Sequence, residues 1–143
     1  MKIAIGSDHA GFSLKEELAG LLKSMGHDVQ DVGAFSEERT DYPDFAKKVA
    51  ESVAARRVDR GVLVCGSGIG MCMAANRIHG VRAAVLREEI DAKLSREHND
   101  ANLACLGGRI TGFDKAERLL EVFLSTPFEG GRHAPRIQKL DRP

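Results

Sequence analysis

The residues of this sequence best suited to chemistry lie in a glycine loop near its middle. Cys65 is followed by Gly66, Ser67, Gly68, Ile69 and Gly70. Glycines at alternate positions before a helix let backbone N–H groups approach an anion, and the helix dipole adds favourable charge. The loop lacks the Lys-Ser/Thr pair of a Walker loop, and Met71 stands where a dinucleotide fingerprint has its third glycine. It therefore indicates either a small-oxyanion site or a merely tight turn.

Cys65 is the candidate nucleophile or base. A thiol at the last position of a strand, facing a helix N-terminus, can have its pKa lowered from about 8.5 towards neutrality. Most buried cysteines are structural, and this alternative stays open for Cys65. We assign Cys72, on the following helix, and Cys105, in a later strand, to that structural role.

Three of the five histidines stand in segments typical of a site. His9 follows Asp8 in a loop bounded by glycines, and His98 ends a predicted helix just before Asn99. Histidines in such positions can transfer protons near neutral pH, although a single one is more often structural.

The third of these histidines, His133, lies in a basic segment close to the end of the chain. Arg132 and Arg136 flank it. Guanidinium groups bind phosphate oxygens in a fork, so the segment suits a phosphate. Charge alone favours a solvated basic tail instead.

The elements that must position these residues follow from an alternation of apolar runs and helical patterns, which is typical of βα units and a mainly parallel sheet. In such sheets ligands bind outside the carboxyl ends of the strands, where these loops fall. We predict a three-layer α/β/α sandwich of Rossmann-like type forming one domain over residues 1–143. Strands are expected at 2–5, 27–32, 61–65, 81–86 and 103–106, and helices at 13–25, from 41 onward, after Gly70 to about 77, at 88–98 and at 114–124.

Local patterns add detail to two of the predicted helices and to the end of the chain. Ser13 to Glu16 matches a capping box at the start of the first helix, whose buried stripe would run from Leu14 to Met25. Gly26 is expected to end that helix. The helix at 88–98 should turn Ile90 and Leu94 inward. Residues 129–143 form a polar tail.

Composition excludes several classes of function. The chain has 21 basic and 21 acidic residues in 143, so its formal net charge is zero. That balance argues against a nucleic-acid binder or an anionic-membrane binder. No apolar run approaches the 18 or so residues of a membrane span, and three cysteines do not make a disulfide framework. We expect a cytoplasmic protein with free thiols.

Six ordered segments together resemble the ribose-5-phosphate isomerase B family, which is related to galactose-6-phosphate isomerase subunits. They extend over nearly the whole chain, so they are far more specific than one glycine loop. The segments are residues 6–12 (GSDHAGF), 41–44 (DYPD), 65–70 (CGSGIG), 95–102 (SREHNDAN), 107–109 (GGR) and 128–133 (FEGGRH).

This resemblance implies interconversion of D-ribose 5-phosphate and D-ribulose 5-phosphate, with no metal and no organic cofactor. By resemblance Cys65 is the base that takes the carbon-2 proton, Ser67 assists at the enediolate, and His98 opens the sugar ring. The backbone N–H groups of residues 66–70 would form the anion hole. The implied substrate-binding residues are Asp8, His9, Tyr42, Gly66, Ser67, Gly68, Ile69, Gly70, Asn99, Arg109, Arg132 and Arg136.

One feature of the family supports Cys65 as the base. A second branch has glycine at that position and a glutamate one residue after the last loop glycine, where this chain has Met71. Ile90 departs from the aromatic residue common at its position. The resemblance also implies a homodimer whose sites are completed by the partner, in some members paired further into tetramers.

Three alternatives stay open. The first is an isomerase of a hexose phosphate, such as allose 6-phosphate or galactose 6-phosphate. The second is a non-catalytic module that binds sugar phosphates, although such a module needs neither Cys65 nor Ser67 nor His98. The third is a Cys/His hydrolase, for which the sequence shows no obvious carboxylate to orient the histidine.

Overall fold

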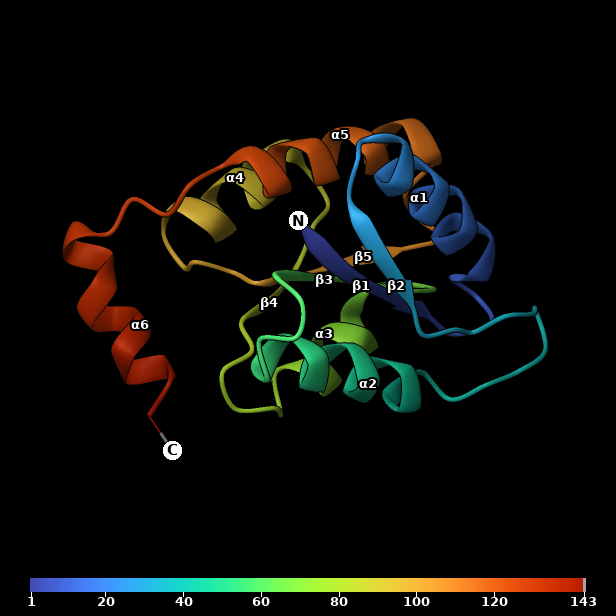
Figure 1. The fold of residues 1–143 in the computed structure, drawn as a ribbon, viewed down its shortest axis with the longest axis horizontal. Coiled ribbons are helices and arrows are strands. Elements are labelled where there is room, and N and C mark those ends of the chain that lie inside the picture. Colours follow the sequence, from blue (N-terminus) through green and yellow to red (C-terminus); the bar gives the residue numbers. More distant parts are fainter. Residues whose placement is uncertain (143) are drawn as a thin grey trace.

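The computed structural model describes residues 1–142 as alternating strands and helices around one sheet (Figure 1). This confirms the predicted Rossmann-like α/β class. The strands are β1 (Lys2–Ser7), β2 (Asp28–Asp31), β3 (Arg60–Cys65), β4 (Ala83–Val85) and β5 (Leu103–Gly107). The helices are α1 (Phe12–Ser24), α2 (Tyr42–Ala54), α3 (Ile69–Ala75), α4 (Glu89–Glu97), α5 (Phe113–Ser125) and α6 (Ala134–Leu140), with a short 3₁₀ helix η1 (Gly131–His133).

The sheet is parallel in every pairing, with strand order β2-β1-β3-β5-β4. β3 is the middle strand, as its almost wholly apolar sequence predicts for a strand covered on both faces. Cys65 pairs with Gly107 at the carboxyl end of β5, and Ser7 of β1 pairs with Val64. The loops that follow β1, β3 and β5 therefore leave the sheet at the same edge.

Two helical layers cover the sheet (Figure 1). Helices α1, α4 and α5 pack on the face that receives Val62 and Val64, whereas α2 and α3 pack on the face that receives Leu63 and Cys65. Side chains alternate between the two faces of a strand, which explains this division. The Cys65 side chain thus points into the layer that contains the glycine loop and α3.

The start of α1 differs from the prediction. Ser13 lies inside the helix, the N-cap residue is Gly11, and no side chain caps it. Asp8 instead accepts hydrogen bonds from the N–H groups of Ala10 and Gly11, both at 3.0 Å, so the turn before the helix is held from upstream. At the other end Gly26 adopts φ +88° beside the C-cap residue Met25, as the sequence predicts.

The buried face of α1 contains a cation that the periodicity did not predict. Lys15 is fully buried, and its Nζ lies 2.7 Å from both Glu16 and Asp31. Met25, expected in the apolar stripe, is 40% exposed. The two ion pairs compensate the positive charge of Lys15, whose burial without partners would cost free energy of folding.

Two further predictions fail, one in α4 and one in the carboxyl-terminal segment. Ile90 is 55% exposed, because α4 buries Ala92, Ser95 and Arg96 and residue 90 lies about 200° around the helix from residue 92. The polar tail is in part helical: η1 and α6 form there, with a proline in the first turn of α6. Figure 1 shows α6 standing apart from the two helical layers.

Within residues 1–142, none of the helices combines the length and the apolar character needed to cross a membrane.

Candidate active site

The loops after β1, β3 and β5 surround a cavity of about 430 Å³, which we call the thiol pocket. Its size falls within the usual range of small-molecule sites. The chain reaches it from four segments, so residues far apart in sequence meet there. The lining residues are Asp8, His9, Ala10, Tyr42, Cys65, Gly66, Ser67, Gly70, Arg109 and Ile110.

The Cys65 thiol is held by the loop that follows it. Cys65 is 4% exposed, and its Sγ accepts a hydrogen bond from the Gly68 N–H at 3.1 Å. Gly68 adopts φ +79°, and a Cβ there would meet the backbone of Leu106 at 3.0 Å. The left-handed, crowded position requires glycine, and it aims the N–H at the sulfur. This hydrogen bond fixes the position of the sulfur at the end of β3.

The Asp8 carboxylate connects the β1 loop to the pocket. Asp8 is buried, and its Oδ1 takes both N–H groups of the turn before α1. A carboxylate has about four acceptor positions, so the group retains capacity for a hydroxyl of a ligand. Gly11 allows the turn to lie against β3, since a Cβ there would be 2.3 Å from the Val64 carbonyl oxygen.

His9 is fixed by a residue that the sequence did not single out. The Thr40 N–H donates to His9 Nδ1 at 3.2 Å, and the His9 N–H donates to Thr40 Oγ1 at the same distance. Because Nδ1 is the acceptor in this pair, the proton of a neutral His9 ring belongs on Nε2. His9 is therefore arranged as a donor towards the thiol pocket. No spacing pattern indicates Thr40, which lies in an irregular loop.

Two side chains close the rim of the pocket. The Tyr42 ring covers Gly70, where a Cβ would lie 2.8 Å from Tyr42 Cζ. Arg109 lies against Gly66, and its backbone N–H donates to the Gly66 carbonyl at 3.1 Å. Small residues at 66 and 70 thus admit a phenol and a guanidinium to the same cavity.

The N–H groups of the glycine loop are partly engaged within the loop. The Ile69 N–H donates to Ser67 Oγ at 3.2 Å, as the Gly68 N–H does to Cys65. Arg87, which lies just before α4, donates a side-chain hydrogen bond to the Ser67 carbonyl at 3.2 Å and so holds the loop in place. Gly68 and Ile69 are absent from the lining of the cavity. Their contribution is to orient the thiol and the hydroxyl.

The remaining predicted residues lie elsewhere. Asn102 pairs with Gly61 near the amino end of β3, and His98 and Asn99 precede it at that edge of the sheet. Cys65 lies four residues further along β3, which is about 13 Å in the strand direction. Asn99 borders a different cavity, of about 590 Å³, beside α6. The thiol pocket of this chain is therefore lined by none of His98, Asn99, Arg132 and Arg136.

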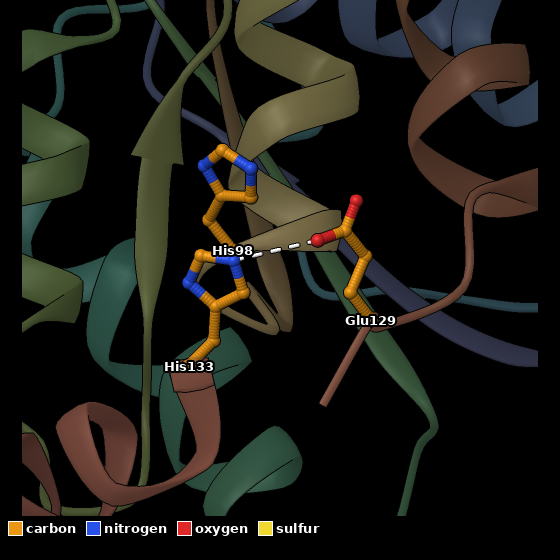
Figure 2. A group of neighbouring side chains, drawn as sticks. All are labelled: His98, Glu129 and His133. Carbon is orange, nitrogen blue, oxygen red and sulfur yellow. Dashed lines mark ion pairs between the residues drawn. The ribbon is translucent and has the colours of Figure 1, made fainter. Parts of the chain in front are cut away.

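His98 belongs to a second group, which we call the histidine cluster: His98, Glu129 and His133. Figure 2 shows the two imidazoles side by side and the Glu129 carboxylate turned towards them. The ring centroids are 4.3 Å apart with an interplanar angle of 16°, and His133 Nε2 lies 3.4 Å from Glu129 Oε2. Burial, followed by the nearby His98 and Arg132, lowers the pKa of His133. From the sequence, the segment around His133 is interpreted as either a phosphate site or a solvated basic tail, and no role is predicted for Glu129.

The two cysteines assigned to structural roles differ from each other. Cys105 is fully buried, and burial raises its pKa well above the ordinary value. Cys72 is half-buried, and a hydrogen bond with Cys105 lowers the pKa of its thiol to about 7. Cys105 fits the structural assignment. Cys72 differs, because a thiol with a pKa of about 7 is partly ionised at neutral pH; it stands two residues after the glycine loop 65–70.

The parallel sheet with a cavity at its carboxyl edge, lined by a thiol, a hydroxyl, an imidazole and a buried carboxylate, defines an α/β protein built to bind and process a small polar molecule. Comparison with known proteins narrows this class. The sequence profile of the ribose/galactose isomerase family matches residues 3–140, and the chain belongs to that family.

Individual relatives agree with this assignment. Ribose-5-phosphate isomerase B of Escherichia coli (strain K12) is 45% identical over 139 residues, covering 97% of this chain and 93% of the relative. A solved ribose-5-phosphate isomerase B from Clostridium thermocellum superposes with a TM-score of 0.97 at 49% identity, covering 99% and 95% of the two chains. The enzyme from Mycoplasma genitalium, solved with bound ribulose-5-phosphate, gives a TM-score of 0.95 at 42% identity, covering 99% and 94%.

Proposed function

We propose that this protein interconverts D-ribose 5-phosphate and D-ribulose 5-phosphate by proton transfer between adjacent carbons. The observation that carries the proposal is the thiol pocket, where a thiol held by a backbone N–H lies beside Asp8 and Ser67. Relatives named ribose-5-phosphate isomerase B, covered over nearly their full length, support the choice of substrate.

The reaction needs a base, stabilisation of an enediolate and a group that opens the sugar ring. Cys65 Sγ, as thiolate, takes the proton from carbon 2, and the electron pair passes to the carbon-1 carbonyl oxygen to give the enediolate. The Cys65 thiol then returns its proton to carbon 1, and the proton of oxygen 2 passes to oxygen 1, so oxygen 2 becomes the ketone oxygen and oxygen 1 becomes a hydroxyl. Ser67 donates to the enediolate, and Asp8 orients the sugar hydroxyls.

Ring opening and phosphate binding require a second protomer. His98, the proposed ring-opening group, lies towards the other edge of the sheet from Cys65. The proposed phosphate ligands, Arg132 and Arg136, flank His133 in sequence, and the His133 ring stacks on His98. We therefore propose a homodimer in which the histidine cluster of one protomer faces the thiol pocket of its partner. His9, Tyr42, Asn99 and Arg109 complete substrate binding. This arrangement explains how one small chain can supply both halves of the chemistry.

A hexose phosphate is the second candidate substrate, because galactose-6-phosphate isomerase subunit LacB of Clostridium acetobutylicum is 40% identical over 139 residues. The protein can be assayed with both a five-carbon and a six-carbon sugar phosphate. We expect higher kcat/KM on D-ribose 5-phosphate than on allose 6-phosphate or galactose 6-phosphate. Equal or lower efficiency on the pentose would contradict the proposal.

The decisive assay measures conversion of D-ribose 5-phosphate in deuterium oxide with a chelator present. We expect turnover and deuterium incorporation by the unaltered protein and neither in Cys65→Ala. Cys72→Ala is the matched control and should retain turnover, since Cys72 is not part of the pocket lining. Substantial turnover by Cys65→Ala would remove Cys65 as the base. A cytoplasmic location is proposed with this function, because all three cysteines are free thiols.

A further inference from the structure

The histidine cluster contains a buried nitrogen that no group within residues 1–142 of the chain satisfies. His133 is 5% exposed, yet within residues 1–142 its Nε2 has no hydrogen-bond partner. The nearest recorded polar atom is Glu129 Oε2 at 3.4 Å, beyond the usual length of an N–H···O bond. Buried polar atoms are normally paired, so an orphaned one points to a missing partner.

The 3.4 Å separation has the length expected between two ligands of one metal ion. Zinc binds imidazole nitrogen at about 2.0–2.1 Å and carboxylate oxygen at about 2.0–2.2 Å in tetrahedral geometry, which places the two donor atoms about 3.3–3.5 Å apart. A ring nitrogen of His98 supplies a third donor, and the three donor atoms lie within 4.8 Å of one another. We propose that His98, Glu129 and His133 form a binding site for a divalent cation of the zinc class.

The local backbone prepares this site. The Glu129 N–H donates to the Glu97 carbonyl at 3.1 Å, which ties residue 129 to the end of α4 beside His98. Gly130 and Gly131 adopt φ of +68° and +55°. These left-handed positions turn the chain so that His133 returns over Glu129, and the His133 N–H closes the turn on the Gly130 carbonyl at 3.0 Å.

Binding requires one imidazole to move. The lone pair of an imidazole nitrogen lies in the plane of the ring, so two stacked rings cannot direct their lone pairs at one ion. His133 is buried with Glu129 beside it, whereas His98 is only half-buried and ends α4. His98 is therefore the ring that turns. Three protein ligands leave the fourth position to water or to an oxygen of a ligand.

The site has a consequence that rests on the proposed function. A cation held by His98 occupies the group proposed to open the sugar ring, so zinc-class ions would inhibit the isomerase reversibly. The chain uses no metal for the isomerisation itself under that proposal. The site is thus an inhibitory one, and chelation restores activity by freeing His98. Arg132 and Arg136, both exposed nearby, oppose the added positive charge and keep binding reversible.

Cobalt(II) titration tests the site without relying on activity. The full chain carrying Cys65→Ser is titrated with Co²⁺, whose visible absorption reports coordination. We expect one ion per chain, displacement by Zn²⁺, and no thiolate-to-cobalt absorption in the near ultraviolet. Glu129→Gln and His133→Asn should each weaken binding at least about tenfold. Glu51→Gln, another exposed glutamate in a weak ion pair, is the matched control and should bind as the parent does.

Two results would overturn the proposal. One is equal cobalt affinity in Glu129→Gln and Glu51→Gln; the other is a thiolate absorption band that disappears in Cys72→Ser. Inhibition is a separate readout: Zn²⁺ should inhibit the unaltered enzyme and inhibit Glu129→Gln at least about tenfold less strongly. If the protein shows no isomerase activity, the proposed function fails while the cobalt titration still decides the site.

Discussion

The glycine at position 68 offers the sharpest test of how the loop prepares the thiol. Gly68→Ala adds a Cβ at φ +79°, 3.0 Å from the backbone of Leu106. The left-handed conformation alone costs an alanine about 1–2 kcal/mol, and the contact with backbone atoms adds to that. The loop must shift, and the shift carries the Gly68 N–H away from Cys65 Sγ.

The expected loss of activity follows from that hydrogen bond. Hydrogen bonds to charged groups contribute about 1.5–3 kcal/mol, so kcat should fall about 10- to 150-fold if the N–H holds the thiolate. The free energy of unfolding, measured in urea, should fall by at least about 1–2 kcal/mol. Substrate KM should change much less, because the proposed phosphate ligands Arg132 and Arg136 are not among the residues that line the thiol pocket.

Gly20→Ala provides the control. A Cβ at Gly20 meets no atom within 4 Å, and the residue lies inside α1. Alanine there should stabilise the helix by about 1 kcal/mol and leave kcat unchanged. If Gly68→Ala is destabilised as expected but keeps full kcat, the hydrogen bond to Cys65 has no catalytic importance and the reasoning is refuted.

Three further predictions concern other parts of the pocket. Gly70→Ala would place a Cβ 2.8 Å from Tyr42 Cζ, so it should push the Tyr42 ring aside and raise KM, and an unchanged KM would show that Tyr42 does not contact substrate. Thr40→Pro removes both the N–H donor to His9 Nδ1 and the Oγ1 acceptor of the His9 backbone N–H, and it should raise KM about 2- to 12-fold with little change in kcat; an equal fall in kcat would contradict a role of His9 in substrate binding. The pKa of Cys72 is lowered to about 7, so the rate at which iodoacetamide alkylates it, followed by mass spectrometry, should rise with pH and be half-maximal near pH 7. A midpoint near pH 9 would contradict the lowered pKa.

The sequence was sufficient to predict the order of the five strands and of helices α1 to α5, and the convergence of the loops after β1 and β3. Both follow from local patterns combined with the geometry of parallel sheets: a βα loop always leaves at the carboxyl edge. The apolar run 61–65 predicted a central strand for the same reason, since only a strand covered on both faces can be apolar throughout.

Other features depend on contacts that no local pattern records. The burial of Lys15 requires Asp31 on a neighbouring strand, and the tautomer of His9 depends on a backbone N–H in an irregular loop. Exposure of Ile90 reflects which face of α4 meets the core, and α6 forms where composition suggested only a polar tail. The separation of His98 from Cys65 was likewise visible only once the sheet fixed which edge each residue occupies.

Complementation between two inactive variants tests the shared site most directly. Cys65→Ala and His98→Asn are mixed in equal amounts, unfolded and refolded together, and assayed on D-ribose 5-phosphate. Random pairing makes half of the dimers mixed, and each mixed dimer has one pocket with both Cys65 and His98, so activity should recover to about one quarter of the unaltered level. Mixed dimers that form but stay inactive would contradict a site built from Cys65 of one protomer and His98 of its partner.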